Sequence, residues 1–332
     1  MSRQIPIFLI TLFLNTWAGD ERFLASPLPA RLLAEAPLSA NDAQALAPQT
    51  GATSGRPPQA PQGATPEARG TWLARQVDER DTGKDARMDM RMKLYDRQQR
   101  VRERALSLVS IRGGAGRPVP ADRSLIRFTH PADIKGTGFL VWEQPDADDE
   151  RFLYLPSLGR VRRIAGSEAQ ESFVGSDFTY EDIGGREFEN YTYRLIETPS
   201  VTTTWTAPDG SKHAVYTLES RSRDASARFP RVVSLVLQDH LVVVRAEIRN
   251  RRDEPQKLYE ALRVEKVLKK GSTDGYWTVL EMRMTDSVQR TKTELVLERV
   301  EYDVGLKADD FSRRELERGG TWPVAQPQAS AR

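Results

Sequence analysis

The sequence RMDMRMKL, residues 87–94, alternates between charged and apolar side chains at every position. Because successive side chains of a β-strand point to opposite faces of a sheet, this segment is predicted to be a strand with one apolar and one hydrated face. The sequence YWTVLEMRM, residues 276–284, repeats the pattern near the other end of the chain. Methionine is the main apolar residue of both segments, which predicts a sheet with a flexible apolar face.

Weaker alternation recurs along most of the chain. The further predicted strands are residues 106–111, 125–129, 138–143, 191–196, 213–219, 231–238, 241–248, 258–268 and 294–302. Turn signals separate them, among them Pro208-Asp209-Gly210 and Asp274-Gly275. Strand–helix–strand alternation is absent from the pattern. The sequence therefore predicts about a dozen strands in hairpin order within an antiparallel sheet.

Helical segments are scarce, being limited to residues 69–80, a short turn near 177–183 and residues 309–318. A long twisted sheet curls as it grows, and few helices are present to fill the space inside it. The predicted fold is mainly β: a single large, strongly curved antiparallel sheet, an incomplete barrel, capped by a few short helices. Its apolar face would line a ligand cavity, formed by Met88, Met90, Met92, Leu94, Phe139, Val141, Leu280, Met282 and Met284.

A closed barrel or sandwich with an ordinary packed core fits the same alternation equally well, because the pattern does not report whether the space is filled. In that case the methionines are gap fillers. An outer-membrane barrel would also alternate. It is disfavoured because the polar faces carry dense charges of both signs and the chain ends in the polar sequence QASAR.

The chain is predicted to have four parts. Arg3 and the apolar run at residues 5–14 are typical of a signal peptide, residues 1–18, with Thr16-Trp17-Ala18 at its cleavage site. This run is much shorter than the about 20 residues of a membrane-spanning helix. An Ala- and Pro-rich flexible spacer follows at residues 19–68, then a ligand-binding domain at 69–320 and a flexible tail at 321–332. The predicted location is the periplasm of a Gram-negative-type cell.

Composition narrows the possible functions. The 332 residues include 49 basic and 47 acidic side chains, a net charge of +2, which argues against a nucleic-acid partner. Cysteine is absent, and the three histidines, His130, His213 and His240, are too scattered for a metal site. We therefore expect no cofactor, no metal and no catalytic residues, and hence no enzyme.

Two charged clusters stand out. Arg160, Arg162 and Arg163 follow the sequence YLP at 154–156. They favour a charged sheet edge, or otherwise a docking patch for anionic headgroups or a transporter. The acidic run at residues 146–150 lacks the glycine and terminal glutamate of a calcium loop and is predicted to be a solvated turn.

Residues 128–183 carry the most specific signal. The sequences PADIKGT (131–137), LYLP (153–156), RVRRI (160–164) and FVGSDFTYED (173–182) closely resemble the bacterial outer-membrane lipoprotein-sorting protein family. That family is related in fold to the lipoprotein carrier LolA and the receptor LolB. With weaker likeness on both sides, the resemblance covers most of residues 69–318. It implies a half-barrel with an apolar cavity for acyl chains, a periplasmic location and an association with RND-type or MMPL-type exporters.

The expected function is that of a periplasmic carrier or chaperone for a lipid or an acylated lipoprotein. The resemblance implies that it works with an RND-type or MMPL-type exporter and touches membranes transiently. The alternative is a non-catalytic structural adaptor subunit of an envelope transporter that binds no lipid.

Overall fold

The computed structural model describes residues 4–5, 61, 63–144, 147–198 and 201–318. The helices are α2 (Pro66–Asp78), α3 (Tyr180–Gly184) and α4 (Arg313–Arg318). The 3-10 turns are η1 (Pro156–Leu158), η2 (Gly166–Glu168), η3 (Phe173–Gly175), η4 (Phe188–Asn190) and η5 (Ala308–Phe311). The strands are β1 (Gln4–Ile5), β2 (Asp85–Tyr95), β3 (Val101–Ile111), β4 (Arg123–His130), β5 (Gly138–Trp142), β6 (Glu150–Leu155), β7 (Arg160–Ile164), β8 (Arg186–Glu187), β9 (Tyr191–Ile196), β10 (Thr204–Thr206), β11 (Lys212–Ser222), β12 (Arg231–Leu237), β13 (Val243–Arg249), β14 (Pro255–Leu268), β15 (Gly275–Asp286) and β16 (Thr291–Tyr302).

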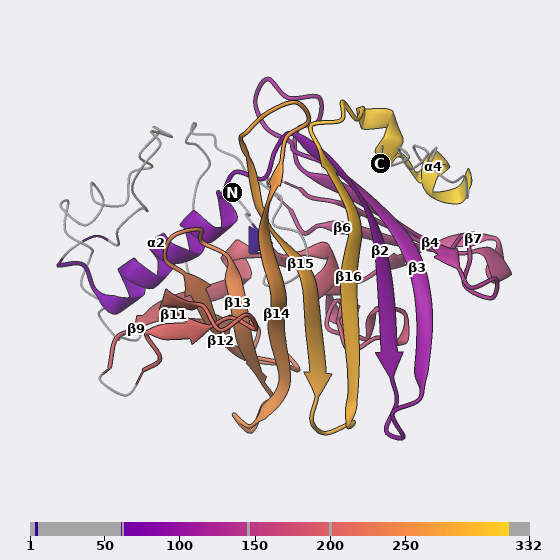
Figure 1. Cartoon of the computed structure of the whole chain (residues 1–332). Coiled ribbons are helices and arrows are strands. Elements are labelled where there is room, and N and C mark those ends of the chain that lie inside the picture. Colours follow the sequence, from indigo (N-terminus) through magenta and orange to yellow (C-terminus); the bar gives the residue numbers. More distant parts are fainter. Residues whose placement is uncertain (1–3, 6–60, 62, 145–146, 199–200, 319–332) are drawn as a thin grey trace, which may run out of the picture.

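Most strands belong to one curved antiparallel sheet, which Figure 1 shows from its outer side. The order is β10-β11-β12-β13-β14-β15-β16-β2-β3-β4-β5-β6-β7, with β9 also paired to β11. Almost all neighbouring strands in the sheet are also consecutive along the chain. The exception in this order is the pair β16 and β2, which joins the last strand of the chain to the first strand of the sheet in sequence. The ends, β10 and β7, do not pair with each other, so the sheet is an open half-barrel as predicted.

The register places the two methionine-rich strands on either side of β16. Met90 lies opposite Leu297, and Met92 lies opposite Leu295. Leu295 in turn lies opposite Met282 of β15. Directly paired residues share one face of a sheet, so these side chains form a continuous apolar stripe across three strands. The alternation seen in the sequence is real: every second residue of β15 is buried.

Helix α2 covers one end of the sheet, beside β9 and β11 (Figure 1). It begins at Pro66, three residues before the predicted start, because the Thr65 side chain caps it by accepting from the N–H of Ala68. Leu73 and Val77 are buried on one face of the helix. Gly70 lies against the backbone of Arg194, where an added Cβ would come within 2.5 Å of three atoms. The helix therefore packs more closely on β9 than a larger residue would permit.

The concave side is covered by residues 165–190, which we call the cover segment; it contains η2, η3, α3, β8 and η4. The outer side has a smaller core of its own. There η5 and α4 pack on β3–β6 through Phe311 and Leu316, both 0% exposed. Trp142 Nε1 donates to the Phe311 carbonyl at 2.6 Å and anchors this segment. The predicted C-terminal helix thus exists, but as a 3-10 turn followed by a short α-helix on the outer face.

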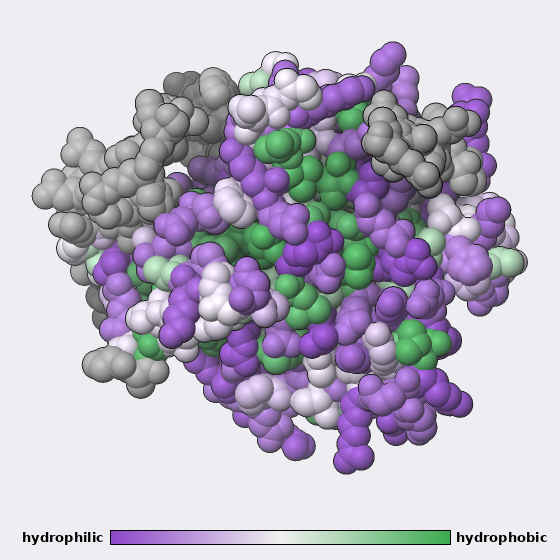
Figure 2. Space-filling view, in the orientation of Figure 1, coloured by the Kyte–Doolittle hydropathy of each residue, from purple (hydrophilic) through white to green (hydrophobic). Residues whose placement is uncertain are grey.

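Figure 2 shows that elsewhere the outer face is mostly hydrophilic, with hydrophobic residues gathered over the middle of the sheet. Cross-strand ion pairs account for the hydrophilic part: Arg91 contacts Glu103 and Glu298 on the two neighbouring strands. Arg283 contacts Glu294 in the same way. Charges of opposite sign alternate across this face, which explains the near-zero net charge of a chain so rich in charged residues.

Five strands were not predicted as strands, namely β1, β6, β7, β8 and β10. The predicted signal peptide, nearly all of the spacer and the tail lie outside the described residues, and those parts of the division remain predictions. Within the signal peptide only Gln4–Ile5 is described, as a short strand paired with β8. Among the described residues, no helix has the length and apolarity needed to cross a membrane.

Candidate functional site: an apolar concave face beside an arginine-rich pocket

The nine residues predicted to line a cavity are brought together on the concave face. All belong to one hydrophobic cluster, and none is more than 7% exposed. Met92, Met282 and Met284 are 0% exposed. Methionine side chains are flexible and polarisable, so a buried group of them can repack around an irregular apolar guest. The structure thus places the nine residues in one buried apolar cluster, and their role as the lining of a ligand cavity stays a prediction.

Phe139, one of the nine, lies under the cover segment. The ring centroid of Phe139 is 5.4 Å from that of Phe173 and 5.3 Å from that of Tyr180. Phe173 also stacks on Phe128 at 5.9 Å. These contacts place the aromatic residues of the segment 173–182 against β4 and β5. Sequence reasoning missed this role, because the aromatic spacing of the segment does not follow a helix or strand period.

A single aspartate fastens the middle of the cover segment to the sheet. Asp177 Oδ2 accepts a hydrogen bond from the Thr293 hydroxyl at 2.7 Å. The backbone N–H of Asp177 donates to the Thr293 hydroxyl oxygen at 3.0 Å. Lys257 Nζ donates to the Asp177 carbonyl at 2.6 Å. Burial raises the pKa of Asp177, and the threonine hydrogen bonds oppose that rise. Loss of the Asp177 side chain would remove its contacts with β16, whereas the Lys257 contact uses the backbone carbonyl.

Beside the cover segment is a polar pocket of about 880 Å³, between that segment and the turns β11–β12 and β13–β14. Two buried arginines contribute to its lining. Arg186 is held by Glu181 at 3.2 Å and Asp182 at 2.8 Å. Arg151 is held by Asp149 at 3.1 Å and Glu187 at 3.4 Å. Buried ion pairs of this kind are costly to desolvate and hold a fixed geometry.

The acidic run at 146–150 is not a solvated turn throughout, which corrects the prediction. Asp149 is 5% exposed and is paired with Arg151. Burial raises the pKa of Asp149 to about 7, against the attraction of Arg151, which lowers it. Nothing in the local sequence indicates that Asp149 is buried.

The sequence TYED at 179–182 builds the wall of the pocket. Thr179 and Asp182 form a capping box, in which the Asp182 N–H donates to the Thr179 hydroxyl at 3.0 Å and Asp182 Oδ2 accepts from the Thr179 N–H at 2.9 Å. Glu181 accepts from the Tyr191 hydroxyl at 3.0 Å. The residues that carry the family resemblance are therefore structural supports of the pocket and of the short helix α3.

The basic cluster lies on β7, the last strand of the sheet, so the predicted charged edge is present. Its three arginines do not share one face. Arg162 lies opposite Leu153 of the concave core, whereas Arg163 lies opposite Phe152 of the outer core. Arg160, two residues before Arg162, shares the concave side with it. Arg162 is paired with Glu168 at 2.6 Å, and Arg163 contacts Glu150 at 3.6 Å.

The histidines lie apart in the fold. His240 stacks on Trp277 with centroids 3.8 Å apart, and His213 contacts Ser211 at 2.9 Å. Across the described ranges, no group of three His, Cys, Asp or Glu side chains is arranged to hold a metal ion.

Several known proteins are similar to this chain in sequence and fold. A family model described as an uncharacterized protein family matches residues 120–318. A DUF1329 family protein from Desulfovibrio piger matches with 31% identity and a TM-score of 0.65, over 76% of this chain and 100% of that one. A domain from Vibrio parahaemolyticus, named as a candidate outer membrane lipoprotein-sorting protein, matches with 27% identity and a TM-score of 0.65, over 75% and 99%. No curated protein matches the sequence.

The fold itself extends to more distant proteins. A LolA superfamily protein from Nitrosomonas europaea matches with 15% identity and a TM-score of 0.53, over 72% of this chain and 95% of that one. At that identity the match is evidence for the fold alone. The half-barrel is thus shared by LolA-like proteins, as the resemblance implied.

Proposed function

We infer the function from one premise: the chain belongs to the DUF1329 family. We propose that it is a periplasmic carrier or chaperone that shelters an acyl chain of a lipid or lipoprotein against the concave face of the half-barrel. The observation that carries this proposal is the continuous methionine-rich stripe on β2, β16 and β15 under a separate cover. The likeness to a lipoprotein-sorting domain supports it.

The energetics of such a role set the size of the required surface. Each methylene group removed from water is worth about 0.8 kcal/mol, so a chain of about sixteen carbons gains about 12 kcal/mol on burial. Lipids therefore cross an aqueous compartment slowly unless a protein shields them. Met88, Met90 and Met92 on one strand and Met282 and Met284 on another supply a deformable apolar surface for that purpose.

Loading and release require that the concave face become accessible. The cover segment is joined to the sheet by polar contacts, chiefly those of Asp177, and by its buried aromatic residues, among them Phe173 and Tyr180. The Arg104 Nη1 contact with the Val174 carbonyl, at 2.6 Å, is a second such fastening. Local opening of an element held in this way costs much less than global unfolding. In this proposal the cover acts as a gate over the concave face.

In this proposal the carrier works with an inner-membrane RND-type or MMPL-type exporter and contacts membranes transiently. It performs no chemistry itself. The exposed arginines of β7 provide a docking edge for that exporter or for anionic headgroups. The cargo is handed over when the docked partner stabilises the open state of the cover.

The test is to place tryptophan on the stripe. Met90→Trp and Met282→Trp should each lower the affinity for a fluorescent fatty acid at least about tenfold, because the added ring fills volume that the acyl chain needs. The melting temperature should hold or rise. Leu140→Trp, in the outer core, is the matched control: it should lower the melting temperature and leave fatty-acid affinity unchanged.

The alternative function, a structural adaptor without a lipid, predicts the opposite signs. A close-packed concave core would be overpacked by either tryptophan, at about 1–3 kcal/mol of stability. If the parent protein also binds no fatty acid, and native mass spectrometry of protein purified from periplasm finds no bound lipid, the carrier proposal is wrong.

A further inference from the structure

Three arginines that line the polar pocket are held by no acidic side chain. Arg223 and Arg228 come from the turn between β11 and β12, and Arg252 comes from the turn between β13 and β14. All three are exposed. None of their guanidinium groups forms an ion pair or hydrogen bond within the described ranges. Three unpaired cations on one pocket repel each other unless an anion joins them.

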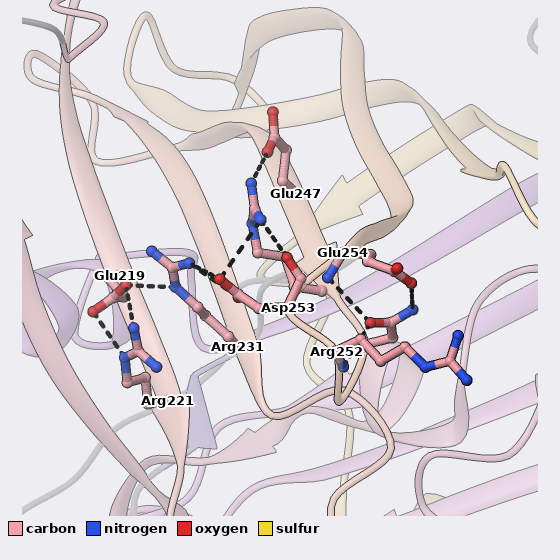
Figure 3. A network of polar contacts seen from close by, with 9 residues as sticks. Glu219, Arg221, Arg231, Glu247, Arg252, Asp253 and Glu254 are labelled. Atoms are coloured by element: carbon pink, nitrogen blue, oxygen red, sulfur yellow. Dashed lines mark hydrogen bonds and ion pairs between the residues drawn. The ribbon is translucent and has the colours of Figure 1, made fainter.

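The neighbouring arginines Arg221 and Arg231, in contrast, form ion pairs with carboxylates. Figure 3 shows Arg221 and Arg231 joined to Glu219, and Arg231 joined to Asp253. In the same view the guanidinium of Arg252 carries no dashed line. Glu219 and Asp253 are therefore engaged by Arg221 and Arg231. The remaining carboxylate of the β11–β12 turn, Asp224, lines the pocket and accepts hydrogen bonds from Ser226.

The turns that carry the arginines are held in place. Gln170 Oε1 accepts the N–H of Arg228 at 2.6 Å and that of Phe229 at 3.2 Å, which ties the β11–β12 turn to the cover segment. Arg251 Nε donates to the Ala227 carbonyl at 3.1 Å and ties the two turns together. The arginines thus project from a braced frame, so binding an anion would order few further residues.

The buried part of the pocket has unused donors. Arg186 is 2% exposed and lines the pocket, yet its Nη1 has no hydrogen-bond acceptor among the described residues. Buried donors are almost always paired, so an acceptor is expected there. Three carboxylates, Asp148, Glu171 and Asp224, also line the pocket without an ion pair in the described part of the chain. Asp148 and Glu171 belong to the side formed by β6 and the cover segment, away from the two arginine-bearing turns. Asp224 lies on the β11–β12 turn itself and accepts from the Ser226 hydroxyl at 2.7 Å.

We propose that this pocket binds a phosphate group through Arg223, Arg228 and Arg252. A phosphate carries up to two negative charges and three acceptor oxygens, which suits several arginines better than the single charge of a carboxylate. The phosphate belongs to the headgroup of a carried lipid or is a free oxyanion. The lipid source rests on the proposed carrier function, whereas the phosphate site does not.

The position of the pocket fits a headgroup site. Tyr191 belongs both to the pocket lining and to the apolar concave core, so the two surfaces meet at this residue. Arg228 lies over the ring of the buried Phe229 at 5.1 Å. An amphiphile can therefore place its phosphate among the arginines while its acyl chains follow the apolar face.

The experiment uses calorimetric titration with three probes: inorganic phosphate, dihexanoyl phosphatidic acid and dihexanoylglycerol. The pocket variant combines Arg223→Gln, Arg228→Gln and Arg252→Gln. A matched control combines Arg97→Gln, Arg102→Gln and Arg314→Gln, three exposed arginines outside the pocket with the same loss of charge. A hydrogen bond to a charged group is worth at least a factor of about ten in affinity. The pocket variant should therefore bind phosphatidic acid at least about tenfold more weakly, and the control should change less than about twofold.

The outcomes separate the two sources and the two proposals. Binding of phosphatidic acid without binding of inorganic phosphate assigns the site to a headgroup, and equal binding of both assigns it to a free oxyanion. If the wild-type protein does not bind dihexanoylglycerol, the carrier function is contradicted, whereas the phosphate site is not. If neither phosphate-bearing probe binds the wild type, or the pocket variant binds them unchanged, the phosphate site does not exist.

Discussion

Protonation of Asp149 should make the unfolding free energy of the protein depend on pH. Burial raises its pKa from the ordinary 3.8 to about 7, so between these values the folded protein holds a proton that the unfolded chain releases. The unfolding free energy should then fall as pH rises from about 4 to about 7, because the folded state binds more protons. Denaturant midpoints of Asp149→Asn should lose this part of the slope. Asp148→Asn, the exposed neighbour, should keep it, and an unchanged slope in Asp149→Asn would contradict the assignment.

At the same scale, the sequence predicted burial better than it predicted pairing. Met88 and Met282 were placed on an apolar face by alternation alone, and both are at most 1% exposed. Nothing in the local sequence around Arg151 and Arg186 reveals that they are buried. Their partners Glu187 and Glu181 lie 36 and 5 positions away along the chain, and only the folded cover segment brings them together. For the same reason the arginine-rich pocket was not predictable.

Among the elements, the cover segment is the one whose detachment from the sheet should change fatty-acid loading most. Asp177→Ala removes the acceptor of the Thr293 hydroxyl, a contact worth about 1.5–3 kcal/mol for a charged acceptor. We expect faster amide hydrogen exchange in residues 165–190 and faster loading of a fluorescent fatty acid. Asp209→Ala is the control, because its hydroxyl contact, with Ser211, stays within one turn. Equal exchange rates in both variants would show that Asp177 is not the fastening.

Element prediction succeeded where side-chain alternation coincided with one buried face. Strands β2, β9 and β15 were placed to within two residues at each end. It failed for β7, where Arg160, Arg162 and Arg163 occupy both faces of an edge strand and leave little apolar signal. It located η5 and α4 along the chain but did not predict that their apolar residues cover the outer face of β3–β6. Burial on both faces of those strands weakens the alternation that prediction depends on.

For the whole molecule, the open edge at β7 determines how the half-barrel meets its surroundings. An unpaired edge strand invites association, and charged residues on it restrict which partners can approach. The structure divides the basic cluster, with Arg160 and Arg162 on the concave side and Arg163 on the outer side. A partner that receives cargo from the concave face should depend on the first two.

We therefore expect Arg160→Glu combined with Arg162→Glu to weaken binding to vesicles of phosphatidylglycerol at low salt. Exposed cations near an anionic surface contribute about 1 kcal/mol each, so the double reversal should lower the affinity at least about tenfold. The difference should vanish at high salt, because screening removes the contribution of exposed charges. Arg163→Glu is the control from the same strand and should have a smaller effect per charge, since it lies on the opposite face. Vesicle sedimentation at two salt concentrations measures this, with melting temperatures to verify folding. If the double variant sediments as the wild type does at low salt, the β7 arginines are only the solvated edge of the sheet, and the exporter or membrane must dock elsewhere.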